Sequence, residues 1–178
     1  MFRKILIYGS FAGLIVGGEL FGVSVGIHGH LGWPWGAVLG YLTMLIALSA
    51  VFVAIKRRRD QDQGGVIKFW PAFGLGLGIS VIAGVFYVLA WEAALTVTHM
   101  DFAGGYAREV IAQAKAKGVA GQALAKVVAD MENFKAQYAN PLYRLPMGFS
   151  EIFPVGVLVS LISAGLLRNS RFLPARRA

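Results

Sequence analysis

Four long apolar runs separated by more polar segments dominate the hydropathy pattern of the chain. They cover residues 5–27, 37–55, 69–95 and 150–167. A transmembrane helix needs about 20 predominantly apolar residues to cross the roughly 30 Å hydrocarbon core of a bilayer. The apolar part of a cleavable signal peptide is shorter, about 7–15 residues, so the first run is better interpreted as a span. The pattern predicts four membrane-spanning helices.

The stretch between the third and fourth runs has a different pattern. Along residues 124–138 apolar side chains recur every three or four positions, with charged and amide side chains on the other faces. This spacing is typical of an amphipathic helix. A weaker stripe precedes it over residues 104–117, and Gly118 is a candidate helix stop. We expect residues 98–145 to form a helical segment outside the membrane, within a single membrane domain covering residues 1–178.

Composition supports the membrane assignment. The AVILMFWYC fraction is 57%, the charged fraction is 15% and the mean hydropathy is +0.63. A soluble domain averages roughly 45–50% apolar, with glycine included, and about 25% charged residues. The chain has no cysteine, which excludes a disulfide framework, a thiol nucleophile and a cysteine-ligated metal. The expected fold class is therefore an all-α membrane protein, a bundle of four transmembrane helices.

The chain has a net charge of +8, and most of its Lys and Arg residues lie next to the ends of the apolar runs. Loops with excess Lys and Arg stay in the cytoplasm, so this distribution predicts that both termini are cytoplasmic. We expect membrane lipids, and not nucleic acid, as partners of these residues, and an anionic-lipid patch at the same place is an additional interpretation. The basic clusters are Arg3 and Lys4; Lys56, Arg57, Arg58, Arg59 and Lys68; and Arg168, Arg171, Arg176 and Arg177.

Glycines repeat every four residues in two of the predicted spans. Small residues four apart lie on one helix face and allow close approach of a second helix in lipid. This spacing is compatible with helix packing inside one bundle and with an interface between two copies of the chain. A homo-oligomer or a larger membrane complex is therefore a possible assembly of the protein. The glycines are Gly9, Gly13 and Gly17; Gly18, Gly22 and Gly26; and Gly74 and Gly78.

Three carboxylates, Glu19, Glu92 and Glu151, lie in or beside the spans, away from the basic clusters. A charge within the membrane is costly, so these residues are candidates for a proton or cation site. Together with His28, His30 and His99 they could form a proton relay or a divalent-cation site.

Each carboxylate also has a structural interpretation. Glu151 follows a serine near a predicted helix N-terminus, where negative charge is favoured, and Glu92 lies where it can reach water. Glu19 is flanked by apolar residues and glycine, and a protonated form or a polar partner on a neighbouring span would stabilise it. The candidate partners are Thr43, Ser49 and Tyr87.

Sequence signatures of catalysis are absent. The chain has no Gly-x-Ser-x-Gly or His-Glu-x-x-His motif, no phosphate loop and no dinucleotide fingerprint. The halves of the spans next to the basic clusters contain serines but no carboxylate, Lys, Arg or His. We therefore expect no enzymatic activity, no cofactor and no bound metal.

The order and spacing of several segments resemble the bacterial membrane proteins of domain-of-unknown-function family 4199. The resemblance covers nearly the whole chain and implies a four-span inner-membrane protein, but no activity. It raises Glu151 as a site candidate, because Glu151 with Pro154 belongs to the shared pattern, whereas Glu19 does not map onto it. The matching segments are Lys4-Ile-Leu-Ile-Tyr8-Gly9, Ile55-Lys-Arg-Arg-Arg59-Asp60, Gly64-Gly65-Val-Ile67, Ala72-Phe73, Asn140-Pro141-Leu142, Glu151-Ile-Phe-Pro154-Val-Gly156 and Ser160-Leu-Ile-Ser163-Ala164.

The sequence thus favours a non-enzymatic structural or accessory protein that associates with itself or with a larger membrane complex. The alternative is a small carrier or channel that binds a proton or cation through Glu151, Glu92 and Glu19.

Overall fold

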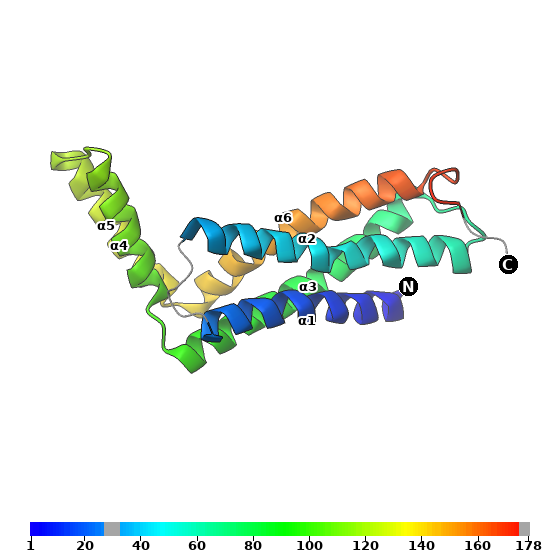
Figure 1. The fold of residues 1–178 in the computed structure, drawn as a ribbon, viewed down its shortest axis with the longest axis horizontal. Coiled ribbons are helices and arrows are strands. Elements are labelled where there is room, and N and C mark those ends of the chain that lie inside the picture. Colours follow the sequence, from blue (N-terminus) through cyan, green and yellow to red (C-terminus); the bar gives the residue numbers. More distant parts are fainter. Residues whose placement is uncertain (27–32, 175–178) are drawn as a thin grey trace. The chain divides into compact units, whose positions relative to one another are not determined.

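The computed structural model of the chain describes residues 1–26 and 33–174, with the backbone alone for residues 33–37 (Figure 1). His28 and His30, from the predicted first turn, lie outside the described residues, as do Arg176 and Arg177.

Within the described residues, four helices are long and apolar enough to cross a membrane, namely α1, α2 with its continuation, α3 and α6. The described residues contain no β-strand. These findings confirm the predicted all-α fold class and indicate a multi-pass membrane protein. The helices are α1 (Phe2–Gly26), α2 (Trp33–Arg57), α3 (Phe69–Thr98), α4 (Phe102–Ala116), α5 (Gly121–Tyr138) and α6 (Pro141–Leu167), and a π-helical turn, η1 (Arg58–Asp62), continues α2.

Helix α6 begins at Pro141 and not near Ser150, where the fourth apolar run starts. The side chain of Asn140 accepts a hydrogen bond from the backbone N–H of Leu142 at 3.0 Å. An Asn before the first turn and a Pro within it are both favourable at a helix N-terminus. The Asn-Pro pair that separates α5 from α6 therefore also starts α6.

Contacts divide the chain into two compact units. We call residues 1–94 and 148–178 the membrane unit, and residues 95–147 the hairpin unit.

Within the membrane unit, α1 and α3 run parallel with glycines at their contacts. A Cβ atom built on Gly13 would lie only 2.6 Å from the Phe86 Cβ. Real Cβ atoms do not approach that closely, so the packing requires a residue without a side chain here. The contacts repeat every four residues and pair Ile5 with Gly78, Gly9 with Ile82, Gly13 with Phe86, and Gly17 with Ala90.

Helices α3 and α6 pack antiparallel through two reciprocal glycine–serine contacts. A Cβ on Gly76 would lie 2.6 Å from the Ser160 Oγ, and a Cβ on Gly156 would lie 2.5 Å from the Ser80 Cβ. Each serine hydroxyl donates to a carbonyl of its own helix, Ser80 to Gly76 at 3.0 Å and Ser160 to Gly156 at 2.7 Å. The two helices therefore approach closely without leaving a hydroxyl unpaired in the core.

One end of the membrane unit, which we call the basic end, joins the start of α1, η1 and the end of α6. The Lys4 Nζ lies 2.7 Å from the Asp62 carboxylate. The Arg59 guanidinium donates to the carbonyl of Leu167 at 3.4 Å. These contacts connect three chain segments that are distant in sequence.

The outward surface of the membrane unit is apolar. Phe11 on α1 is 58% exposed and Ile162 on α6 is 61% exposed. An extensive exposed apolar surface is unfavourable in water, whereas lipid accommodates it.

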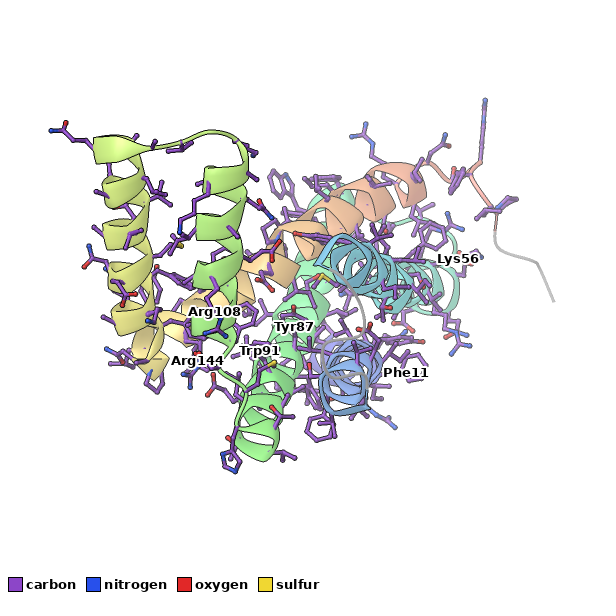
Figure 2. The ribbon with its side chains drawn as sticks, turned by 60° about the vertical axis from the view of Figure 1, so that its left-hand side comes forward. Phe11, Lys56, Tyr87, Trp91, Arg108 and Arg144 are labelled. Atoms are coloured by element: carbon purple, nitrogen blue, oxygen red, sulfur yellow. The ribbon has the colours of Figure 1, made fainter. Side chains whose placement is uncertain are left out.

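The hairpin unit contains the two amphipathic helices expected from the sequence, α4 and α5, which lie side by side (Figure 2). Asp101 caps α4 by accepting a hydrogen bond from the Gly104 N–H at 2.8 Å. Gly118, in the turn between the helices, has a φ of +78°, and Gly121, the first residue of α5, has a φ of +58°. Positive φ values of this size favour glycine. The aromatic contacts that close the hairpin are formed by Phe102, Tyr106, Phe134 and Tyr138.

Candidate functional site

A hydrogen bond between two side chains joins α3 to α6 inside the membrane unit. The Tyr87 hydroxyl donates to the Glu151 carboxylate at 2.8 Å. Tyr87 is only 7% exposed, whereas Glu151 is exposed. In an apolar surrounding such a bond both positions the carboxylate and fixes the phenol. This pair is a polar contact between the side chains of two membrane-spanning helices.

The other two candidate carboxylates, Glu19 and Glu92, lie at about the same level along the helix axes, and Glu151 lies at a different level. Glu19 and Glu92 are both half-buried, and the parallel register of α1 and α3 places them level. The antiparallel register of α3 and α6 places Glu151 level with Val85, about 10 Å nearer to the basic end at the helical rise per residue.

Two of the three partners considered for Glu19 are bonded elsewhere. Tyr87 donates to Glu151, and the Ser49 hydroxyl donates to the Ile46 carbonyl at 2.6 Å. The hydroxyl protons of Tyr87 and Ser49 are thus used in bonds to other groups and not in a bond to Glu19.

The described residues contain no group of three His, Asp or Glu side chains arranged to hold a metal ion. His99, the candidate histidine that the structure describes, is exposed and follows directly after α3. Of the three candidate carboxylates, Glu151 is the one that accepts the hydrogen bond of Tyr87.

A fully buried arginine forms the second polar centre, at the basic end. Arg59 is 0% exposed, and its Nε lies 2.7 Å from Asp60. Its Nη atoms donate to the carbonyls of Phe172, at 2.8 Å, and Leu173, in addition to that of Leu167. Buried charges are tolerated when they are paired and hydrogen-bonded, so Arg59 serves to fasten the segment after α6 to η1.

The four consecutive basic residues that follow the second apolar run, Lys56 to Arg59, have different environments. Lys56 pairs with Asp60, which Arg59 also contacts. Arg57 is exposed and its Nη1 donates to the Tyr8 hydroxyl at 3.2 Å. Arg58 is half-buried, and its Nη1 is buried without a hydrogen-bond partner.

The glycine rows of α1 also differ. Gly9, Gly13 and Gly17 contact α3, but a Cβ on Gly18, Gly22 or Gly26 would meet nothing within 4 Å. Of the α3 glycines, Gly78 is tight against Ile5, whereas Gly74 has only an ordinary contact.

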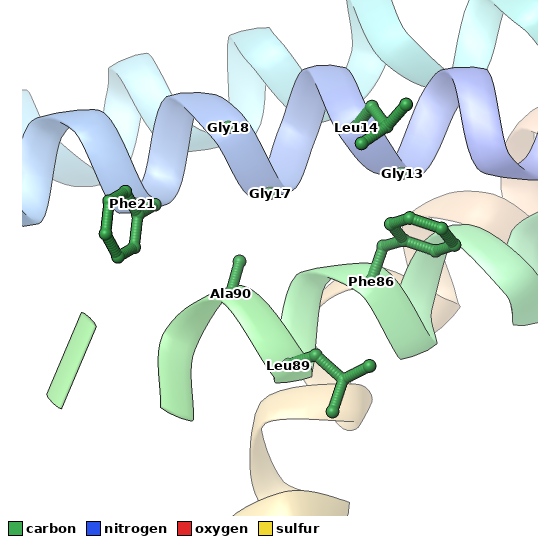
Figure 3. Close-up of a pocket in the computed structure, with 8 residues that line it drawn as sticks. All are labelled: Gly13, Leu14, Gly17, Gly18, Phe21, Phe86, Leu89 and Ala90. Carbon is green, nitrogen blue, oxygen red and sulfur yellow. The ribbon is translucent and has the colours of Figure 1, made fainter. Parts of the chain in front are cut away.

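A shallow apolar groove of about 350 Å³ lies between α1 and α3, next to the open glycine row. Figure 3 shows Phe86 and Ala90 of α3 directed toward α1 across it. The groove is lined by Gly13, Leu14, Gly17, Gly18, Phe21, Phe86, Leu89 and Ala90.

Sequence reasoning missed the contacts of Gly76, Gly84 and Gly156. Gly84 lies against Phe149 of α6. The other two begin a Gly-x-x-x-Ser sequence in each helix, ending at Ser80 and Ser160, and this repeated spacing was a usable signal. The fastening role of Arg59 had no local signal, because its acceptors are more than one hundred residues away.

Comparison with known proteins gives a family match. No curated protein matches the chain, and no solved structure does. The model of the family described as a protein of unknown function, DUF4199, matches residues 6–169, which is most of the chain and confirms the resemblance found from the sequence. The chain is therefore a multi-pass membrane protein that belongs to the DUF4199 family.

Proposed function

We propose that the protein is a non-enzymatic structural or accessory protein of the bacterial inner membrane that works in an assembly, either with its own copies or with another membrane protein. Both termini lie in the cytoplasm in this proposal.

The close packing of α3 against α6 is the observation that carries the proposal. Between α3 and α6, a Cβ atom added at Gly76 or Gly156 would overlap Ser160 or Ser80, so the two helices leave no room between them at these positions. The serine hydroxyls there are bonded to their own helices and offer no chain of polar groups. The halves of the spans next to the basic end contain no carboxylate, Lys, Arg or His, so a cation would find no stabilising ligand on that route.

The topology is supported by charge. Lys4, Arg57 and Arg168 lie at the same end of the membrane unit, because α1 starts there and α2 and α6 end there. A cluster of this kind stays on the cytoplasmic side during insertion. A green fluorescent protein fused after residue 178 is expected to fluoresce.

An ion-flux measurement tests the proposed role. The full chain is reconstituted into vesicles that contain a pH-sensitive dye, and a proton or potassium gradient is imposed. The account predicts the same leak as in protein-free vesicles. A protein-dependent flux that disappears in the E19Q/E92Q/E151Q variant would contradict the structural role.

The alternative role, a proton or cation carrier, is favoured by one observation. The Tyr87–Glu151 hydrogen bond lies within the spans, and proton relays use such pairs. The carrier would need a conformational change that separates α3 from α6. In the flux measurement Y87F would then lower the rate while a substitution at the exposed Ile162, I162L, would not.

A further inference from the structure

Glu151 lies on the outward face of α6. The opposite face of this helix, with Ile152 and Ser160, is buried, whereas Glu151 is exposed. Leu158 and Ile162 are 58% and 61% exposed, and with about 3.6 residues per turn they lie on the same side of the helix as Glu151. A carboxylate therefore lies on a surface that is otherwise apolar. We call this surface the outer face of α6; it consists of Glu151, Pro154, Leu158, Ile162 and Gly165.

The depth of Glu151 in the membrane makes its exposure costly. Leu167, the last residue of α6, lies at the basic end, and Glu151 precedes it by 16 residues, or about 24 Å at the rise of an α-helix. The hydrocarbon core is roughly 30 Å thick, so the carboxylate lies inside its outer quarter. A charged group in contact with lipid at this depth is unfavourable.

The contacts of Glu151 hold the carboxylate in place without neutralising it. The Tyr87 hydroxyl donates to its Oε2 atom at 2.8 Å, which fixes the carboxylate. None of the ion pairs formed within residues 1–26 and 33–174 includes Glu151. Because a charge removed from water requires a counter-charge as well as hydrogen bonds, the complementary group is a cation from outside the chain.

The sequence restricts the source of that cation. The four apolar runs contain no Lys or Arg, so the spans of a second copy offer no cation at this depth. Two copies in the same orientation that met through this face would bring two Glu151 carboxylates to the same level, where like charges repel. The complementary occupant is therefore a transmembrane helix of a different protein, with a Lys or Arg in the outer quarter of the membrane.

We propose that the outer face of α6 docks a transmembrane helix of another membrane protein, with Glu151 paired to a Lys or Arg of that helix. Each charge is unfavourable alone in lipid, and pairing lowers the cost of both. Leu158 and Ile162 supply apolar contacts, and Gly165, where a Cβ would meet nothing within 4 Å, allows close approach of the partner helix. This docking rests on the proposed role in an assembly, for which it supplies the chemistry of the partner.

Association with synthetic transmembrane peptides in phosphatidylcholine vesicles tests the proposal. The full chain, which has no cysteine, is labelled at Q63C, an exposed position after η1, and energy transfer to labelled peptides is measured. Two polyleucine peptides with tryptophan at both ends differ at one position, about four residues from one end, which holds lysine or leucine. The account predicts that the lysine peptide binds about tenfold more tightly. Equal binding of the two peptides would overturn the proposal.

The variant E151Q removes the charge but keeps an acceptor for Tyr87. It is expected to reduce the preference for the lysine peptide to within about twofold. D130N is the matched control, because it removes a carboxylate that is exposed on α5, outside the spans, and it is expected to keep the preference. An unchanged preference in E151Q, or an equal loss in D130N, would overturn the role of Glu151.

The variant L158W tests the outer face without changing a charge. A bulky ring two turns from Glu151 is expected to lower the affinity for the lysine peptide about threefold or more. I46W is the control, at a residue of α2 that is 59% exposed, and it is expected to leave the affinity unchanged. An equal effect of the two substitutions would place the peptide elsewhere and overturn the assignment to α6.

Energy transfer between two labelled copies of the chain distinguishes this docking from self-association. The account predicts the same transfer between copies for E151Q and for the native chain. Transfer that E151Q abolishes, together with equal binding of the two peptides, would show a second copy on the outer face and overturn the proposal. The ion-flux measurement does not depend on the peptides, so equal peptide binding without ion flux would reject this docking and leave the structural role in place.

Discussion

Helix α1 has a closed face and an open face, and both are built from glycines four residues apart. On the closed face Gly9, Gly13 and Gly17 lie against side chains of α3. On the open face Gly18 and its two successors meet nothing within 4 Å. The same four-residue spacing therefore gives one glycine row that packs against α3 and one that packs against nothing in the described chain. The difference depends on which face of α1 the third span covers.

Closed and open positions can also be distinguished in the rest of the membrane unit. Closed positions such as Arg59 and Tyr87 make contacts that hold helices together, so changing them should affect stability. Open positions such as Gly22 have no such contact within the described chain, so changing them should affect only what binds from outside. The following predictions test this separation, from the largest expected effect to the smallest.

Replacing Arg59 should have the largest effect on stability. R59Q removes a buried charge that donates to the carbonyls of Leu167, Phe172 and Leu173. Breaking a buried ionic contact of this kind costs about 3–5 kcal/mol. R57Q is the matched control, with the same loss of charge at an exposed residue and an expected cost below about 1 kcal/mol. Unfolding by a denaturing detergent, followed by circular dichroism, measures both, and equal midpoints for R59Q and the native chain would contradict the fastening role.

Filling the closed glycine face should be the next largest effect. In G13L the new Cβ would overlap Phe86, 2.6 Å away, and overpacking costs about 1–3 kcal/mol. G22L makes the same change where nothing lies within 4 Å, and its stability should stay within about 0.5 kcal/mol of the native chain. The same unfolding measurement applies. Similar destabilisation in the two variants would remove the distinction between the faces.

The Tyr87–Glu151 hydrogen bond should contribute less to stability than the contacts of Arg59 or Gly13. Hydrogen bonds between transmembrane helices average about 0.6 kcal/mol in double-mutant cycles. A cycle of Y87F, E151Q and the double variant isolates the coupling between the two side chains. The expected coupling is favourable and of about that size, whereas strictly additive effects would mean that the pair does not hold α3 to α6.

The smallest effect on stability, and the clearest one on assembly, is expected at Gly22. Because the chain contains no cysteine, G22C introduces a single thiol on the open face. If copies meet there, mild oxidation in native membranes should give a disulfide-linked dimer. L42C is the control, since Leu42 is 51% exposed on α2, and it should remain monomeric. Cross-linking at position 42 but not at 22 would place the interface on another face.

The fold was largely predictable from the sequence, because membrane spans depend on local length and hydropathy. The start of α6 at Pro141 was less predictable, because the pair Asn140-Pro141 can end one helix and also begin the next. The carboxylates of the candidate site were found from their apolar neighbours. Their pairing was not predictable, because the hydrogen bond from Tyr87 to Glu151 depends on the register between α3 and α6.

The glycine rows show the same limit. Spacing predicts that a helix approaches α1 closely, but Gly13 and Gly22 cannot be distinguished until the position of α3 is known. Arg59 appears in sequence as one of a run of basic residues, and only the path of the chain after Leu167 shows why it is buried.

The mass of the complex extracted from its native membrane in mild detergent tests the central claim most directly. The account predicts a defined oligomer of this 19.1 kDa chain, or a stoichiometric complex with another membrane protein. A monomer alone, under conditions in which known membrane complexes of the same preparation stay intact, would contradict a role in an assembly.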